Sequence, residues 1–101
     1  MGFKIFWTPT AEQTFSDEID FILVKWNESA VVTFINLVDN CLVNLQAYSY
    51  LGQLIKNKGI HRFVISKHTT LFYKVYPESE RIDLILFYNN LLDPKILHKY
   101  F

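Results

Sequence analysis

Two stretches in the first half of the chain repeat apolar residues at the spacing of a helix face. The first stripe advances by four, four, three and four residues and consists of Ala11, Phe15, Ile19, Ile22 and Trp26. The second stripe consists of Val31, Phe34, Ile35, Val38, Cys41, Leu42 and Leu45. The pattern predicts two antiparallel amphipathic helices, near residues 9–26 and 28–46, joined by a tight turn at Asn27.

The residues ahead of the first stripe indicate where its helix begins. Residues 3–7 are apolar and aromatic apart from one lysine, which is typical of a strand. Thr8 can then cap a helix with Pro9 at its first position. Alternatively, Thr10 can cap it, with Gln13 completing a capping box. We therefore expect a short N-terminal strand that leads directly into the helices.

The second half of the chain contains shorter apolar runs. Three of them cover residues 60–66, 71–77 and 82–89, and the separators KHTT and ESER are short enough for hairpins. Residues 46–59 show no sustained period and are expected to form a connecting loop, whereas LLDPKIL is expected to close the sheet. This order predicts an α+β fold, in which the N-terminal strand joins a small antiparallel β-sheet and the two-helix antiparallel hairpin packs on one face of it. The other face of the sheet is then open to solvent or to a partner.

Alternation along these runs does not identify the buried side of the sheet. Arg62 shares a side with Val64, and Lys74 shares a side with Phe72, so polar and apolar residues mix on the same face. The pattern therefore leaves open which side meets the helices.

The composition predicts a single compact domain that covers residues 1–101. Of the 101 residues, 50% are hydrophobic and 17% are aromatic, which is too apolar for a disordered chain. No apolar run reaches the length of a membrane span, and no secretory signal pattern is present. The single cysteine, Cys41, is interpreted as a core residue and not as a nucleophile. Because one cysteine cannot form an internal disulfide, we expect a protein of the reducing cytoplasm. Because no apolar run is long enough to span a membrane, we expect no membrane contact.

Charge is divided unevenly between the two halves. Residues 1–50 hold two basic and six acidic side chains, whereas residues 51–101 hold eight basic and four acidic ones. The segment 51–77 has no acid, and its cations are Lys56, Lys58, Arg62, Lys67 and Lys74. This distribution suggests one face for an anionic partner, although ordinary solvated surfaces are the simpler explanation of charge alone.

Three segments give the chain a family resemblance. They are WTPTAEQTFSDEIDFI on the first helix, GIHRFVISKHTTLFYKVY over the basic strands, and IDLILFYNNLLDPKIL at the end. Their order and spacing resemble the RelE/ParE superfamily of bacterial toxins from type II toxin–antitoxin systems. The shared features are an arginine-bearing strand, a histidine turn, a tyrosine strand and a final strand that runs into an Asp/Asn-Pro tail. The likeness covers nearly the whole chain.

The resemblance implies a growth-inhibiting toxin of a plasmid-stabilisation type of module, held in check by a cognate antitoxin. We expect the antitoxin to bind by strand addition, by an amphipathic helix, or by both. ParE-like members poison DNA gyrase, and RelE-like members cut mRNA in the ribosomal A site. We expect a ParE-like toxin that binds a macromolecular target such as DNA gyrase. The alternatives are a RelE-like ribosome-dependent mRNA endoribonuclease and an inactive relative that only binds the antitoxin. No small-molecule cofactor and no metal are expected, and whether the chain is an enzyme stays open.

Candidate site residues follow from the same resemblance. Arg62 stands where the family places a sheet arginine, although a shift of one residue would place His61 there. A metal-free ribonuclease needs such a cation beside a base and an acid. His68 and Tyr88 are weak candidates for the base and the acid. The simpler interpretation of His68 is a surface residue of a turn, and that of Tyr88 and Tyr73 is core packing in a strand. The candidates for target contact are Lys56, Lys58, Arg62, Lys67 and Lys74.

Three departures from the family pattern weaken the nuclease alternative. Leu91 stands where many relatives carry an arginine just ahead of the Asp/Asn-Pro tail. The preceding YNN has no histidine where some nuclease members have one, and His98 lies beyond the proline. Part of the nuclease machinery is therefore missing from the matching positions, and a fold alone does not carry an activity.

Overall fold

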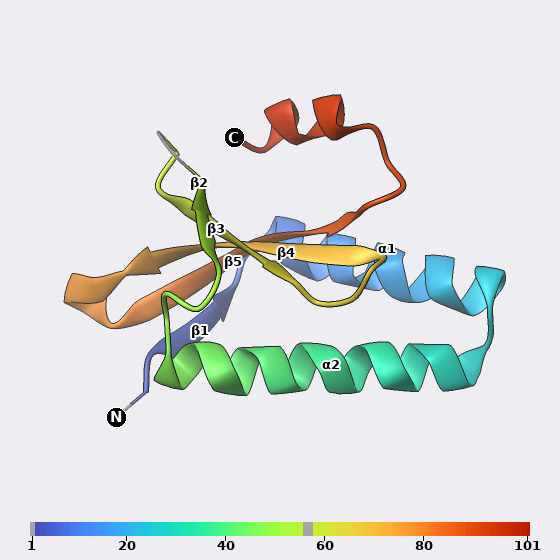
Figure 1. The fold of residues 1–101 in the computed structure, drawn as a ribbon, viewed down its shortest axis with the longest axis horizontal. Helices are drawn as coiled ribbons and strands as arrows, with labels where there is room; N and C mark the ends of the chain where they lie inside the picture. Colours follow the sequence, from blue (N-terminus) through green and yellow to red (C-terminus); the bar gives the residue numbers. More distant parts are fainter. Residues whose placement is uncertain (1, 56–57) are drawn as a thin grey trace.

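The computed structural model describes residues 2–55 and 58–101 of the chain (Figure 1). Its elements, in chain order, are β1 (Lys4–Trp7), α1 (Pro9–Lys25), α2 (Glu28–Ala47), β2 (Gln53–Ile55), β3 (Ile60–Val64), β4 (Thr69–Tyr76), the 3-10 turn η1 (Pro77–Ser79), β5 (Arg81–Asn89) and the 3-10 segment η2 (Pro94–Lys99). The two long helices lie side by side under one face of the sheet, and η2 lies over the other face (Figure 1). The predicted α+β fold is confirmed.

Both helices begin at side chains that cap their first turn. The Thr8 hydroxyl accepts a hydrogen bond from the Ala11 N–H at 3.1 Å, and the Asn27 side chain accepts one from the Ala30 N–H at 2.9 Å. Pro9 occupies the first turn of α1, where its missing N–H costs nothing. The two predicted helices are therefore confirmed to within one residue at each end, and Thr8 is the cap of the first.

The five strands form one sheet in the order β1-β5-β4-β3-β2. The strands β3, β4 and β5 form the predicted antiparallel meander. The N-terminal strand pairs with this meander as expected, but β1 runs parallel to β5, with Lys4 opposite Arg81, so the sheet is mixed.

Two details of the predicted second half are wrong. The segment expected to be a loop contains β2, whose three residues pair with β3 and are too few to show a period. Thr69 and Thr70, expected in a turn, belong to β4, because they pair with Asn89 and Tyr88 of β5. Their hydroxyls are also bonded within the fold. Thr69 donates to the Glu18 carboxylate, and Thr70 donates to the Asn90 side chain at 2.8 Å.

The main core lies between the sheet and the helices. A shift of register between Phe72 and Tyr73 places a bulge in the pairing of β4 with β5. On β5, Leu84 faces the helices before the bulge and Phe87 faces them after it, which a strict period of two cannot produce. The buried members of this core are Ala11, Ile22, Phe34, Val38, Cys41, Leu45, Ile65, Leu71, Tyr73, Ile82, Leu84 and Phe87.

The C-terminal segment covers part of the opposite face instead of closing the sheet, as LLDPKIL was expected to do. Asp93 accepts a hydrogen bond from the Lys95 N–H at 3.0 Å and so begins η2. The ring of Phe101 then packs on Phe72, with 5.0 Å between ring centroids. A second, smaller apolar cluster forms under this segment, built on Ile60, Phe72, Leu86 and Tyr88.

By length and composition, α2 passes a test for a membrane-crossing helix. This is weak evidence, because the core helix of a soluble protein passes the same test. In this fold its apolar stripe packs into the main core through Phe34, Val38, Cys41 and Leu45.

Candidate functional site

Arg62 lies on β3, on the sheet face that carries η2, and its side chain is exposed. Its Nε and Nη2 groups both donate to Gln53 Oε1, at 3.1 and 2.8 Å, across the β2–β3 pair. A neutral amide orients the guanidinium without cancelling its charge. In the part of the chain that the structure describes, no carboxylate forms an ion pair with Arg62. The guanidinium therefore keeps its positive charge and part of its donor set for another group.

A pocket of about 390 Å³ lies between this arginine and the C-terminal segment, and we call it the C-terminal pocket. Phe72 and Phe101 contribute aromatic surface to it, and Lys58, Arg62 and His98 contribute the basic side chains. None of the described residues that line it is acidic. Its complete lining is Gln53, Leu54, Ile55, Lys58, Arg62, Phe72, Pro94, Leu97, His98 and Phe101. The arrangement suits an anionic group attached to an apolar body.

The other predicted contact lysines lie in different surroundings. The Lys74 ammonium lies 5.3 Å from the centre of the Tyr76 ring, and Lys74 stands opposite Asp83 in the pairing of β4 with β5. Lys67 is exposed in the turn between β3 and β4. Lys56 lies outside the described residues. The structure therefore brings Lys58 and Arg62 into one pocket and leaves Lys67 and Lys74 out of its lining.

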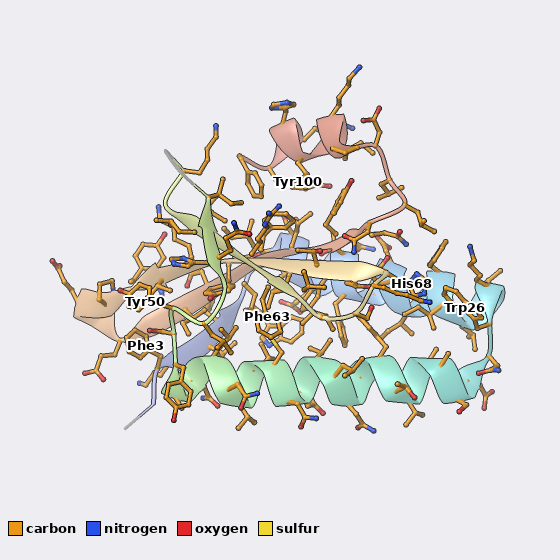
Figure 2. The ribbon with its side chains drawn as sticks, in the orientation of Figure 1. Phe3, Trp26, Tyr50, Phe63, His68 and Tyr100 are labelled. Carbon is orange, nitrogen blue, oxygen red and sulfur yellow. The ribbon has the colours of Figure 1, made fainter. Side chains whose placement is uncertain are left out.

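His68 lies in the predicted turn, but it packs against the far end of the helical hairpin. Its ring is 4.7 Å from that of Trp26, and Figure 2 shows the two side chains together beside the turn between α1 and α2. Both line a second pocket of about 320 Å³, whose other residues are Ile22, Ala30, Thr33, Phe34, Leu37 and Ser66. His68 and Arg62 therefore line separate pockets.

The two candidate tyrosines are buried and hydrogen-bonded to the backbone. The Tyr88 hydroxyl donates to the Leu92 carbonyl and so ties β5 to the segment that follows it. The Tyr73 hydroxyl accepts a hydrogen bond from the Gly52 N–H at 2.8 Å. Burial raises the pKa of both phenols, that of Tyr73 and that of Tyr88, which favours their neutral form. Arg62, His68 and Tyr88 therefore do not meet around one point.

Gly52 connects this buried network to the C-terminal pocket. A Cβ atom at this position would lie 2.5 Å from the Arg62 carbonyl oxygen and 2.8 Å from the Tyr73 hydroxyl. Only glycine allows the backbone to approach Arg62 and Tyr73 this closely. The next residue, Gln53, orients the Arg62 guanidinium. The sequence pattern gave no sign of this role.

Two buried titratable groups were also missed. Glu18 is only 4% exposed, although the acids of a surface helix usually face solvent. It accepts the Thr69 hydroxyl bond, and burial raises the pKa of this carboxyl. His61 stacks on Tyr73 with 5.3 Å between ring centroids, and burial lowers the pKa of its imidazole. A signal existed for Glu18, because it stands three residues after Phe15 and so falls on the apolar stripe.

Comparison with known proteins gives the fold a family. Residues 5–88 match the family described as the ParE toxin of the type II toxin–antitoxin system parDE. No curated protein matches the chain by sequence. Among solved structures, the chain is similar to one from the chromosomal ParDE system of P. aeruginosa, with a TM-score of 0.71 and 13% identity over 86% of this chain and 95% of that one.

Two further structures share the fold. The similarity to the Mycobacterium tuberculosis RelBE2 toxin–antitoxin complex has a TM-score of 0.64 and 12% identity, over 89% of this chain and 100% of that one. The similarity to a mutant of the E. coli toxin RelE in the free state has a TM-score of 0.66 and 12% identity, over 99% and 95%. At these identities the structures show the fold, and the family match covers most of the sequence. The chain therefore belongs to the ParE toxin family of type II toxin–antitoxin systems, whose toxins have a cognate antitoxin as partner.

Proposed function

We propose that this toxin inhibits growth by binding a macromolecular target, DNA gyrase, and that Arg62 and Lys58 in the C-terminal pocket make part of that contact. The family match is to ParE toxins. The resemblance described in the sequence analysis implies that ParE-like members poison gyrase. Binding alone needs a shaped, charged surface and no reacting groups.

The observation that carries the proposal is the separation of the candidate catalytic groups. A metal-free ribonuclease needs a base, an acid and a cation around one phosphate. Here His68 packs on Trp26, and the Tyr88 hydroxyl is bonded to Leu92. Of these three candidates, Arg62 alone lines the C-terminal pocket. These surroundings favour a binding role for Arg62 over a catalytic one.

One observation favours the RelE-like alternative. His98 lines the same pocket as Arg62 and Lys58, so an imidazole and two cations share one cavity there. A ribonuclease with a rearranged site would use His98 for proton transfer and the cations for the phosphate. The C-terminal pocket is thus the site to test under either alternative.

Growth assays test whether Arg62 contributes to toxicity. The chain is induced alone in a bacterial host, and growth, DNA breaks and protein synthesis are followed. We expect growth arrest with DNA breaks for the wild type and weaker arrest for Arg62→Ala. The underlying loss of target affinity should be about tenfold or more, equivalent to roughly 1.4 kcal/mol. Arg62→Lys should restore little, because lysine lacks the planar pair of donors.

The matched control is Arg81→Ala, which removes the other exposed arginine of the sheet. Arg81 is already paired with Asp83 at 2.7 Å, so its loss should leave toxicity nearly unchanged. Equal toxicity of wild type and Arg62→Ala would remove this pocket from the proposal. Cleavage of a reporter mRNA at codon positions in a reconstituted translation system would replace gyrase with the ribosome as target, and absence of growth inhibition would favour an inactive relative.

A further inference from the structure

We propose that the buried carboxylate of Glu18 is a positioning residue for the C-terminal pocket. In its ionised form Glu18 orients the Asn89 amide, and this amide holds the start of the C-terminal segment, residues 91–101, in place over the sheet. The inference rests on the proposed function only in giving this pocket a role in toxicity. A charge on the helical side of the sheet thus maintains the wall of a pocket on the opposite side.

Glu18 lies where α1, the end of β5 and the C-terminal segment meet. It is buried, and its carboxylate accepts a hydrogen bond from the Thr69 hydroxyl on β4. A cavity of about 120 Å³ lies beside it. Leu92, Ile96 and Tyr100 of the C-terminal segment line this cavity together with Glu18. The helix and the C-terminal segment therefore meet around one small cavity at this carboxylate.

The Asn89 amide connects the carboxylate to the C-terminal segment. Its side-chain oxygen accepts a hydrogen bond from the Leu91 N–H at 2.8 Å, and its side chain is also hydrogen-bonded to Glu18. An ionised carboxylate only accepts hydrogen bonds, so it holds the amide nitrogen toward Glu18 and the amide oxygen toward Leu91. A protonated carboxyl can donate to the amide oxygen instead, which leaves the Leu91 N–H without its partner.

The buried charge of Glu18 is costly for the fold. Burial raises the pKa of its carboxyl above the ordinary value of 4.5, and the hydrogen bonds from Thr69 and Asn89 only partly offset this rise. In the part of the chain that the structure describes, no lysine or arginine forms an ion pair with it. Above this raised pKa the folded chain buries a charge that the unfolded chain keeps in water, so the ionised form lowers the free energy of unfolding. Stability alone therefore does not explain a carboxylate at this position.

Other titratable groups also face Glu18. His68, in the turn between β3 and β4, favours the ionised carboxylate, and Asp17 on α1 opposes it. Tyr88 of β5 and Tyr100 of the C-terminal segment line the same cavity. A pH experiment must therefore separate proton uptake by Glu18 from proton uptake by His68.

The start of the C-terminal segment determines where its end lies. After β5 the chain turns back above the sheet (Figure 1). Asp93 begins η2 two residues after Leu91, so a displacement of Leu91 changes the direction in which η2 runs. At the far end, His98 and Phe101 line the C-terminal pocket. Loss of the bond to Leu91 should therefore loosen one wall of the pocket while the strands stay in place.

Glu18→Gln removes the charge and keeps the shape of the side chain. NMR of the full-length chain measures amide exchange at Leu91, and urea unfolding measures global stability. We expect exchange at Leu91 to become about two- to tenfold faster, which is the effect of one hydrogen bond. The free energy of unfolding at neutral pH should not fall, because a buried charge is removed. A residue with only a structural role would change both measurements in the same direction.

Asp17→Asn is the matched control, because it removes a carboxylate one residue away on the same helix. Asp17 is exposed and accepts a hydrogen bond from Gln13, so exchange at Leu91 should change less than about twofold. Asn89→Ala removes the acceptor of the Leu91 N–H directly and should match Glu18→Gln at this amide. The double variant of Glu18 and Asn89 should exchange no faster than Asn89→Ala alone, which marks the two residues as one unit.

The wild-type chain provides a test that does not depend on the folding of any variant. As pH falls from about 8 toward about 5, Glu18 takes up a proton, and exchange at Leu91 should approach that of Glu18→Gln after correction for the intrinsic effect of pH. Any pH dependence from His68 or His98 persists in the variant, so the difference between the two profiles belongs to Glu18. Parallel profiles would overturn the inference.

Toxicity separates this inference from the proposed function. Faster exchange at Leu91 in Glu18→Gln with unchanged toxicity supports the positioning role and contradicts the role of the pocket in toxicity. Unchanged exchange in Glu18→Gln, together with weaker toxicity of Arg62→Ala, supports the proposed function and overturns the inference. A fall in global stability that accounts for the faster exchange also overturns it, because Glu18 is then a structural residue only.

Discussion

The two faces of the sheet differ in how completely they are buried and in how their polar groups are satisfied. On the helical face, Leu71, Tyr73 and Leu84 have no exposed surface, and the Thr69 hydroxyl is bonded to a buried carboxylate. On the opposite face, one short C-terminal segment lies over the sheet (Figure 1). It covers a small apolar cluster and leaves a charged pocket beside it. The comparison indicates that the helical face provides most of the stability, whereas the other face carries the proposed contact site.

Large-to-small substitutions should separate the two faces most strongly. Leu71→Ala on the helical face should lower the free energy of unfolding by about 2–5 kcal/mol, since the residue is fully buried among well-packed neighbours. Leu97→Ala, at a half-buried residue of the C-terminal segment, should cost only about 1 kcal/mol. Urea unfolding of both variants measures the difference. Similar losses would mean that the C-terminal segment is as important to the fold as the main core.

The two buried tyrosines give a matched pair with smaller effects. Tyr73→Phe removes the acceptor of the Gly52 N–H and should cost about 1–3 kcal/mol. Tyr88→Phe removes only the donor to the carbonyl of Leu92, a half-exposed residue, and should cost about 0.5–1 kcal/mol. Hydrogen exchange should show faster opening of residues 94–101 in the second variant alone. The opposite ranking would contradict the assignment of stability to the helical face.

The smallest expected effect is a dependence of stability on pH from His61. Burial between Tyr50 and Tyr73 lowers the pKa of this imidazole in the folded state, so the unfolded chain takes up a proton first. Stability should therefore fall as pH drops below about 6.5, the ordinary value for histidine. His61→Phe should flatten the profile in this range, as measured by thermal unfolding between pH 5 and 8. An unchanged profile would assign the pH dependence to other groups.

Local signals explain which parts of this fold could be predicted from the sequence. The bounds of both helices were predicted closely, because the capping residues Thr8 and Asn27 stand directly ahead of them and their apolar stripes are long. The buried side of β4 could not be predicted, because both of its faces are buried: Leu71 and Tyr73 belong to the main core, whereas Phe72 belongs to the second cluster. On β5, the bulge opposite Phe72 and Tyr73 also changes the alternation halfway along the strand. The three residues of β2 carry no period, and their pairing depends on β3.

Two residues of the candidate site were predicted: Arg62 from the family resemblance and Lys58 from the run of cations without an acid. Gln53, the hydrogen-bond partner of Arg62, was assigned to a loop. His98 reaches the pocket because the chain turns back over the sheet after β5, where Phe101 packs on Phe72. Contacts of this kind join residues far apart in the sequence, so no local sequence pattern predicts them.

The pairing of the first strand with the last has a consequence for the synthesis of the toxin. Thr8 donates through its hydroxyl to the carbonyl of Leu84, 76 residues later, and Lys4 lies opposite Arg81. A nascent chain that emerges from its N-terminus therefore presents both helices before their sheet partner exists. The C-terminal pocket needs Phe101 as well, so it is among the last features to form. During translation the toxin thus lacks its candidate contact site until nearly all of the described chain has been made.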